Sequence, residues 1–223
     1  MKKIALILGI LITLSSCRKA DAAPADAFAL YFEAPQPIND SELDRFPDKF
    51  RGLYMNSDST FLRINENAIR FENYNKFKIH KNQLDSLKKE YDIVDGKLIT
   101  KDRIQKYDIT SKGDSVMLIE KYVDTLFRFS YYNKVKRIDG KLILSKRDSI
   151  FWTLKILSVE NDILRINHVL LKQDLGKLDS ITAIKSQKID STSFVVKPTR
   201  SEFKSLLKLK SFGYEQQFKK VSK

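Results

Sequence analysis

The chain has 223 residues, of which 42% are hydrophobic and 31% charged, a balance that excludes a fibrous or disordered protein and allows one folded core or two small ones. The formal net charge is +13, so a basic surface could bind nucleic acid, acidic glycans or anionic lipid headgroups. The single cysteine excludes an internal disulfide, a thiolate metal cage and a cysteine redox pair.

Residues 1–16 have the layout of a secretory signal peptide. Lys2 and Lys3 precede an apolar run that extends from residue 4 to residue 14. This run has 11 residues, whereas a membrane-spanning helix needs about 20, so we expect it to be removed rather than to stay in the bilayer. The sequence predicts export, and the remaining chain keeps a charge of +11.

The segment Leu14-Ser15-Ser16-Cys17 resembles the lipobox of bacterial lipoproteins, in which signal peptidase II cuts before a cysteine that carries diacylglycerol and is then N-acylated. The resemblance implies that Cys17 is a lipid anchor rather than a nucleophile. Two or more acyl chains hold a protein stably at a bilayer, where one chain is marginal. The alternative is an ordinary signal peptide followed by a chance cysteine, or an internal thiol.

The predicted domains follow from this leader. Residues 17–27, rich in alanine, form a lipidated tether, and residues 28–223 form a single β-rich globular domain. Arg18 follows the cysteine, so the lipoprotein rule by which Asp at this position retains the protein at the inner membrane does not apply, and the outer membrane is favoured. Only Asp21 and Asp26 are acidic in the tether, which favours the periplasmic face over the cell surface.

Turn-forming residues divide the chain after the tether into short segments. Residues 39–46 supply helix-capping side chains ahead of two apolar residues, and Pro47 follows, which predicts one or two helical turns. Residues 61–64 and 69–71 are apolar runs separated by the turn residues 65–67, which is typical of a hairpin.

Farther along the chain, an aspartate followed by Ser, Thr or Gly recurs before apolar or aromatic runs, which predicts turns followed by strands. Most of these turns are too closely spaced for a crossover helix, so neighbouring strands should be antiparallel. The predicted fold class is mainly β with minor helix (α+β), an antiparallel meander or partly closed barrel-like sheet plus a C-terminal helix. The predicted turns are Asp114-Ser115, Asp124-Thr125, Asp139-Gly140, Asp148-Ser149, Asp179-Ser180 and Asp190-Ser191.

Two segments show clear periodicity. Residues 150–157 place apolar side chains on both faces of a strand, which predicts a central strand that holds the core. Thr199 and Glu202 form a capping box at the start of the apolar stripe 203–207, which predicts the C-terminal helix. A shorter helix is expected between residues 82 and 90.

The sequence lacks the familiar motifs of catalytic and metal sites. It has two histidines and no HExxH pattern, so no metal and no cofactor are expected. His168 lies in phase with Leu164 and Ile166, which favours a core or boundary histidine, and His80 lies in a polar stretch and should be exposed. Without a nucleophile elbow, phosphate loop or calcium loop, the chain is more readily interpreted as a protein other than an enzyme, and no catalytic residue is predicted.

Residues 197–223 contain 8 basic and 2 acidic residues. This segment could form a patch for anionic lipid or an acidic partner, or it could be the solvated face of a helix and a strand, which we favour. Nucleic acid is not an expected partner, because an exported, lipidated protein does not meet the cytoplasmic pool.

Three segments are similar to segments of uncharacterised lipoproteins common in Bacteroidota. The likeness implies an envelope location and a lipid anchor, and it transfers no functional residue. The segments are Phe46-Pro47-Asp48-Lys49-Phe50-Arg51-Gly52-Leu53-Tyr54, Asp124-Thr125-Leu126-Phe127 and Lys197-Pro198-Thr199-Arg200-Ser201-Glu202-Phe203.

Three functions are open at this point. The leading hypothesis is a membrane-anchored envelope lipoprotein that acts as a binding or accessory module, with an envelope protein or an anionic lipid or glycan as its partner. The first alternative is an envelope hydrolase of glycan or lipid that uses dispersed carboxylates, which requires two facing Asp or Glu side chains. The second alternative is a purely structural envelope lipoprotein.

Overall fold

The structure is a computed structural model that describes residues 29–168, 176, 178, 186–209 and 213–221. Its helices are η1 (Asp48–Phe50), α2 (Lys81–Leu87) and α4 (Arg200–Leu206). Its strands are β1 (Ala29–Phe32), β2 (Glu42–Leu43), β3 (Gly52–Met55), β4 (Phe61–Ile64), β5 (Ala68–His80), β6 (Tyr91–Val94), β7 (Lys97–Thr100), β8 (Lys106–Lys112), β9 (Ser115–Arg128), β10 (Asn133–Ile138), β11 (Lys141–Asp148), β12 (Phe151–Glu160), β13 (Ile163–His168), β14 (Gln187–Lys188), β15 (Ser193–Val196) and β16 (Tyr214–Lys220).

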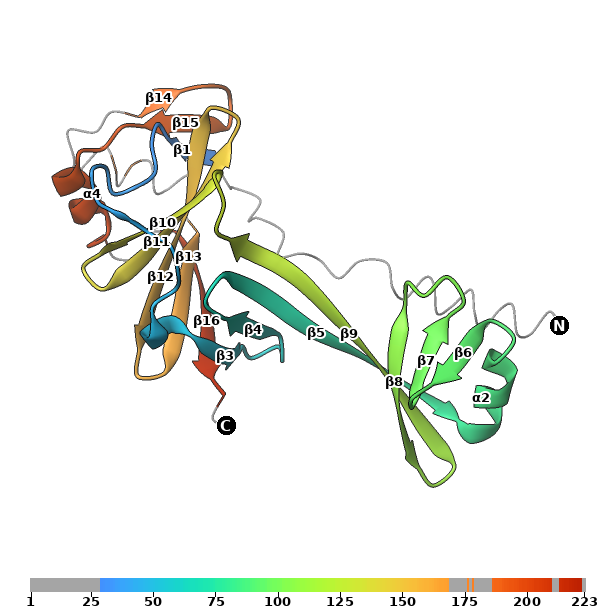
Figure 1. Cartoon of the computed structure of the whole chain (residues 1–223). Coiled ribbons are helices and arrows are strands. Elements are labelled where there is room, and N and C mark those ends of the chain that lie inside the picture. Colours follow the sequence, from blue (N-terminus) through green and yellow to red (C-terminus); the bar gives the residue numbers. More distant parts are fainter. Residues whose placement is uncertain (1–28, 169–175, 177, 179–185, 210–212, 222–223) are drawn as a thin grey trace.

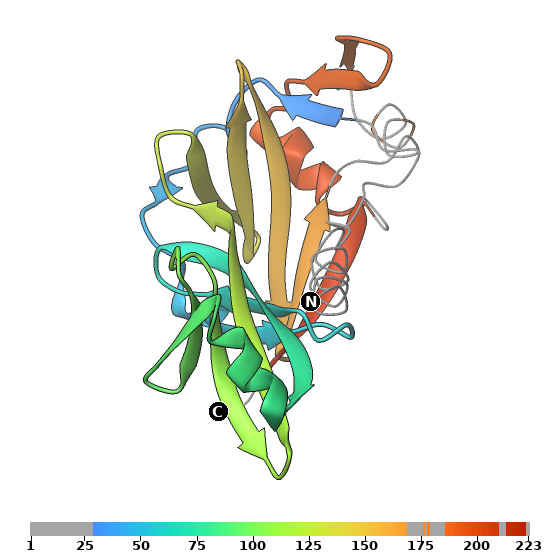
Figure 2. The ribbon, with the colours of Figure 1, turned by 90° about the vertical axis from the view of Figure 1, so that its right-hand side faces the viewer.

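The molecule has two parts, a body and a smaller lobe, which the long strands β5 and β9 join (Figure 1). The lobe consists of α2, β6, β7 and β8 together with the adjoining ends of β5 and β9, residues 75–120. Figure 2 looks at the molecule from the side of the lobe, with the body behind it. The described strands nevertheless belong to one continuous sheet.

This sheet follows an open path. Its main order is β14-β15-β1-β12-β13-β16-β3-β4-β5-β9-β8-β7-β6, and β11, β10 and β2 branch from β12. Neighbouring strands are antiparallel, except that β1 and β15 pair in parallel. The prediction of a mainly β, antiparallel fold is therefore confirmed. The barrel-like alternative is not, because the end strands β14 and β6 lie in the body and in the lobe and the sheet does not close.

Strand β12 lies in the middle of the body, as its alternating pattern predicts. It pairs with β11 along one edge and with β13 along the other. Leu157 is part of the main core, whereas Leu154 and Ile156 are part of a second core on the opposite face of the strand. The main core collects buried side chains from both halves of the body: Phe46, Phe50, Tyr54, Leu62, Ile64, Ile69, Phe127, Val135, Leu142, Leu144, Leu157, Val159, Leu164, Ile166 and Phe218.

Helix α4 covers the second core. Thr199 is its N-cap, and the capping box with Glu202 is formed in both directions, which confirms the predicted helix. Phe203 and Leu206 are buried against β1, β11 and β12, and the ring of Phe203 meets that of Phe32 edge-on. Burying each such side chain contributes roughly 1.5–3 kcal/mol to folding. The sheet of the body is thus packed on both faces.

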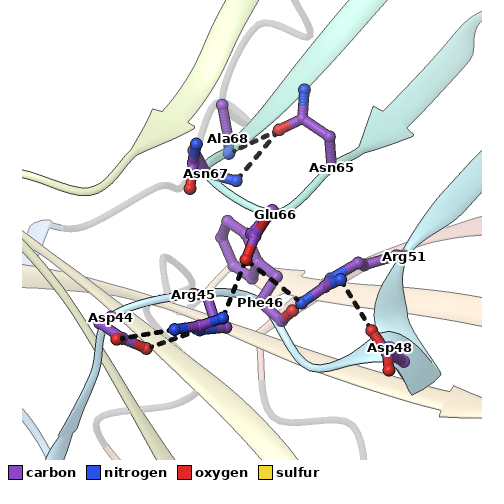
Figure 3. Close-up of polar contacts among 9 residues, drawn as sticks. All are labelled: Asp44, Arg45, Phe46, Asp48, Arg51, Asn65, Glu66, Asn67 and Ala68. Carbon is purple, nitrogen blue, oxygen red and sulfur yellow. Dashed lines mark hydrogen bonds and ion pairs between the residues drawn. The ribbon is translucent and has the colours of Figure 1, made fainter.

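A polar network attaches the segment before β3 to the turn between β4 and β5 (Figure 3). The backbone of Phe46 donates to the carbonyl of Glu66 at 2.9 Å, and the guanidinium of Arg51 donates to the carbonyl of Phe46 at 2.6 Å. Arg45 and Arg51 both approach the Glu66 carboxylate, at 3.1 and 4.0 Å. These exposed ion pairs add little stability. They fix the direction in which Phe46 enters the main core.

The aspartate turns are confirmed at most of the positions that the structure describes. Asp139 and Gly140 both have positive φ, as a two-residue hairpin turn requires, and they join β10 to β11. Asp148-Ser149 and Asp190-Ser191 also lie between strands, and Asp114-Ser115 ends the β8–β9 turn. Asp179-Ser180 lies outside the described residues. The prediction at Asp124-Thr125 is wrong, because this pair lies within β9 beside a shift in its register with β5.

The predicted helical turns before Pro47 are also wrong. Glu42 and Leu43 form the short strand β2, which pairs with β10, and the helical turn η1 begins after Pro47 instead. Leu43 packs beside the main core, and the extended conformation lets it pair with Val135, so tertiary contacts override the local capping pattern. The helix expected between residues 82 and 90 is present as α2.

Candidate functional site

The predicted lipidation site, Cys17, lies outside the described residues, as do the signal peptide 1–16 and the tether 17–27. The first described residue is Ala29, at the start of β1. Within the part of the chain that the structure describes, the helices are all too short or too polar to cross a bilayer.

The two histidines have different environments. His80 is exposed, as predicted, and it caps α2 by accepting from the backbone of Asn82 at 3.4 Å. His168 ends β13 and is half-buried, which agrees with the prediction of a boundary histidine. Its Nδ1 lies 3.0 Å from Nζ of Lys155, and its Nε2 lies 3.3 Å from Oε1 of Gln216.

Sequence analysis gave no sign that the amine of Lys155 is buried. Burial of its amine in β12, with a smaller contribution from the nearby charge of Lys146, lowers its pKa to about 8. A lysine with a lowered pKa is a potential nucleophile, because a larger fraction of its amine is neutral near pH 7. However, the side chain packs in the sheet against His168 and does not line the groove described next.

A groove of about 500 Å³ lies between the end of α4 and the face formed by β12, β13 and β16. Apolar side chains of β12 and of the α4 end form one part of its lining, and charged side chains form the other. The lining residues that matter for chemistry are Lys141, Glu160, Arg165, Asn167 and Glu215.

The charges in this groove satisfy one another. Arg165 lies between Glu160 and Glu215, at 3.7 and 3.5 Å from their carboxylate oxygens. Nζ of Lys141 donates to the carbonyl of Leu207 at 3.1 Å and so caps the end of α4. The groove therefore presents paired charges rather than an uncompensated positive or negative site.

Several basic residues near the C-terminal end are also paired. Lys197 contacts Glu33 at 2.8 Å, Arg200 contacts Asp40 at 2.6 Å, and Lys204 contacts Asp139 at 3.0 Å. Carboxylates from distant segments thus pair with basic residues just before α4 and within it. This arrangement favours the interpretation of the basic segment as a solvated face rather than an anion-binding patch.

A narrow neck connects the body to the lobe. β4 covers β5 as far as Glu72, and β8 covers β9 from Glu120 toward the lobe. Between these limits only β5 and β9 are paired, at Asn73↔Tyr122 and Tyr74↔Lys121. We call these four residues the neck. At its root, the buried carboxylate of Glu72 binds both Arg63, at 2.5 Å, and Lys121, at 3.1 Å.

The lobe has a small core of its own. Leu98, Val116 and Leu118 are buried, and partly buried side chains of β5, α2, β6 and β8 pack against them. The core stabilises the far ends of β5 and β9, because an isolated two-stranded ribbon is only marginally stable in water. Sequence analysis missed this lobe. The signal available was the alternation of polar and apolar residues through residues 73–80, which continues the predicted hairpin strand.

The outer surface of the lobe exposes apolar side chains and an unpaired strand edge. Ile93, Val94 and Ile104 are 40, 49 and 79% exposed. β6 is the last strand of the sheet, so its outer edge presents backbone donors and acceptors that are not paired with another described strand. Exposed apolar residues beside an open strand edge are the features by which proteins bind other chains.

The described residues offer neither a cluster of metal ligands nor a carboxyl group with a raised pKa. They contain no group of three or more His, Cys, Asp or Glu side chains that could hold a metal ion. The described carboxyl groups with displaced pKa values all have them lowered, by hydrogen bonds and nearby cations, whereas a general acid at neutral pH needs a raised one.

The three segments 46–54, 124–127 and 197–203 all have structural roles. Residues 46–54 supply η1, β3 and the network of Figure 3, residues 124–127 lie at the register shift in β9, and residues 197–203 cap and begin α4. Comparison with known proteins adds no family: neither a protein-family model, nor a curated protein, nor a solved structure matches this chain.

Proposed function

We propose that this protein is an envelope lipoprotein, anchored to the outer membrane through acyl chains on Cys17 at the periplasmic face, that acts as a binding or accessory module. Its binding element is the lobe, which contacts another envelope component. The observation that carries the proposal is the lobe itself: a small separate core on a two-stranded neck, with exposed Ile93 and Val94 on the edge strand β6 and exposed Ile104 in the β7–β8 loop.

The paired strands β5 and β9, which we call the arm, have a geometry that suits a binding role. β5 has 13 residues and β9 has 14, so each spans about 40–45 Å at roughly 3.3 Å per residue. Tyr122 of the neck and the adjoining Val123 are 58 and 45% exposed, so the strands extend there with little support from the body. A part that reaches away from the main core contributes little to its stability, and its natural use is contact with something outside the molecule.

The charge distribution supports a partner that is not strongly acidic. Residues 75–120 contain 10 basic and 8 acidic residues, so most of the excess positive charge lies outside the lobe. Apolar side chains and strand edges, rather than net charge, are therefore the features that the lobe offers. We expect a protein partner, bound by apolar contacts or by addition of a strand to β6.

No specific observation favours the hydrolase alternative. The groove beside α4 contains two glutamates, Glu160 and Glu215, but both contact Arg165. Glycoside hydrolysis instead needs two carboxyl groups that face each other across the scissile bond.

The anchor is tested by replacing Cys17 with alanine. We expect metabolic palmitate labelling of the unaltered protein, loss of that label in Cys17→Ala, and release of the variant from the outer-membrane fraction. Equal fractionation of the two proteins would contradict the lipid anchor.

The binding role of the lobe is tested by replacing residues 75–120 with Asn-Gly, so that a two-residue turn joins the paired residues Tyr74 and Lys121. A photoreactive residue at position 93 or 104 should crosslink an envelope protein in cells, and the same residue at Ile189, an exposed position of the body, should not.

The competing outcomes are distinct. If the lobe binds the partner, overexpression of the variant without the lobe should leave the amount of crosslinked product unchanged. Overexpression of the intact protein should reduce that amount, because it competes for the partner. Crosslinking that is equal at positions 93, 104 and 189 would contradict the proposal. A lobe deletion that changes detergent sensitivity while no crosslink forms would favour the purely structural lipoprotein.

A further inference from the structure

One end of the body carries three large, highly exposed side chains. Tyr131, Tyr132 and Ile150 are 70, 59 and 68% exposed, and we call them the tyrosine end. The rings of the two tyrosines lie perpendicular to each other, with centroids 5.2 Å apart. The backbone of Arg147 donates to the carbonyl of Tyr132 at 2.7 Å, so the turn that carries the tyrosines lies against the end of β11, three residues before Ile150.

Basic side chains surround these residues. Arg128 ends β9, and Lys146 and Arg147 lie near the end of β11. None of the three forms an ion pair with a carboxylate in the part of the chain that is described, in contrast to the paired basic residues at the start of α4. Nζ of Lys134 lies 5.7 Å from the centre of the Tyr131 ring and also contacts Glu42.

The N-terminal strand meets the body at the same end. The hydroxyl of Tyr31 donates to Asp148 at 3.3 Å, and its ring lies 5.9 Å from that of Phe151. Tyr31 and Phe32 of β1 therefore lie beside the start of β12, close to the β11–β12 turn, and β1 lies at the top of Figure 1. Residues 18–28 can extend about 40 Å at most, which keeps this end of the body near any bilayer that holds Cys17.

We propose that the tyrosine end rests on an anionic lipid bilayer. Tyrosine favours the boundary between acyl chains and water, Ile150 can enter the apolar region, and Arg128, Lys146 and Arg147 can approach lipid phosphates. The inference rests on the proposed anchoring through Cys17 and adds a second, weaker attachment that sets orientation. β9 leads from Arg128 at this end into the lobe, so the lobe begins about 26 Å from Arg128 and the far end of β9 lies about 43 Å from it, where the lobe can meet its partner.

The test measures which parts of the reconstituted, lipidated protein lie near lipid. A fluorescent dye is attached to a new thiol in Ile150→Cys or, as the matched control, in Ile104→Cys, which is equally exposed but lies in the lobe. The vesicles contain phosphatidylglycerol and phosphatidylethanolamine, with a spin label near the headgroup end of a lipid chain. We expect severalfold stronger quenching at position 150 than at position 104.

Salt and charge substitutions test the role of the basic residues. The difference in quenching should shrink in 1 M salt, and it should shrink in a chain that also carries Lys146→Gln and Arg147→Gln. Equal quenching at the two positions, or stronger quenching at position 104, would overturn the proposed surface. The anchor fails separately: if Cys17→Ala takes up palmitate as the unaltered protein does, lipidation at Cys17 is contradicted, while preferential quenching at position 150 would still support the surface.

Discussion

Glu72 shows how a single buried charge holds the arm to the body. Its carboxylate accepts hydrogen bonds from Arg63 and Lys121, which hold its pKa below the usual range even though burial acts in the opposite direction. Because the folded pKa lies below the unfolded one, this stabilisation is complete above about pH 4.3 and is lost as pH falls through the folded pKa.

Glu72→Gln should therefore destabilise the protein at neutral pH. We expect the free energy of unfolding to fall by about 1–3 kcal/mol at pH 7, because a buried charge-assisted network loses its acceptor charge. Below pH 4 the difference from the unaltered protein should shrink, since Glu72 is then increasingly protonated. Urea denaturation at pH 7 and pH 3 measures both values. Asp85→Asn, which removes an exposed ion pair with Lys88, is the control and should change neither.

Lys155 gives the same sign of pH dependence as Glu72, but in an alkaline range and because burial disfavours its charged form. Burial lowers its pKa to about 8, so the folded state disfavours the charged amine, and the free energy of unfolding should rise as pH increases from about 8 to about 10.4. Lys155→Met removes the buried charge and should stabilise the protein by about 1–2 kcal/mol at pH 7. The gain should be smaller at pH 10. Chemical denaturation of both proteins at the two pH values tests this. If Lys155→Met were less stable than the unaltered protein by the same amount at both pH values, the lost contact with His168 would outweigh the removal of the buried charge.

At the scale of elements, the capping box of α4 is the clearest link from sequence to structure. Thr199 accepts from the backbone of Glu202, and the Glu202 carboxylate accepts from the backbone of Thr199 at 2.7 Å. Thr199→Ala should lower the free energy of unfolding by about 1 kcal/mol, because a backbone donor at the helix start loses its partner. Thr199→Ser keeps the hydroxyl and should behave like the unaltered protein. Urea denaturation of the two variants measures the difference.

Elements with strong local signals could be predicted from the sequence. The α4 capping box, the two-residue turn at Asp139-Gly140 and the alternation of residues 151–157 each act over a few residues, and the structure confirms them, although Ile150 precedes β12 and is exposed. Asp124-Thr125 shows why the same reasoning fails elsewhere. An aspartate that favours a turn is held in a 14-residue strand, because pairing with β5 supplies its backbone with partners along the whole arm.

The candidate binding site was harder to predict than the fold class. Ile93, Val94 and Ile104 lie in short hydrophobic stretches that, in a sequence, look the same as core segments. What makes them accessible is the arrangement of long-range partners: β5 pairs with β9 across residues 81–114, and the neck is not covered by a third strand. Periodicity indicates which side chains share a face, but not whether another element covers that face.

At the scale of the whole molecule, the neck separates two folding regions of unequal size. The main core has fifteen buried residues, whereas the lobe core has three. Because, among the described residues, β5 and β9 are the strands that connect the two, loss of the lobe core need not disturb the body. A molecule built in this way can open locally at low free energy while its global stability stays high.

Leu98→Ala should reveal this separation. Leu98 is fully buried in the lobe core, and its truncation costs about 2–5 kcal/mol, which is more than so small a core can spare. Hydrogen exchange measured by mass spectrometry should show loss of protection throughout α2, β6, β7 and β8, with β12 unchanged. Leu142→Ala, in the main core, is the matched control and should reduce protection in β12. If Leu98→Ala instead raised exchange equally in the lobe and in β12, the two parts would form one cooperative unit, and the lobe would not be an independent binding element.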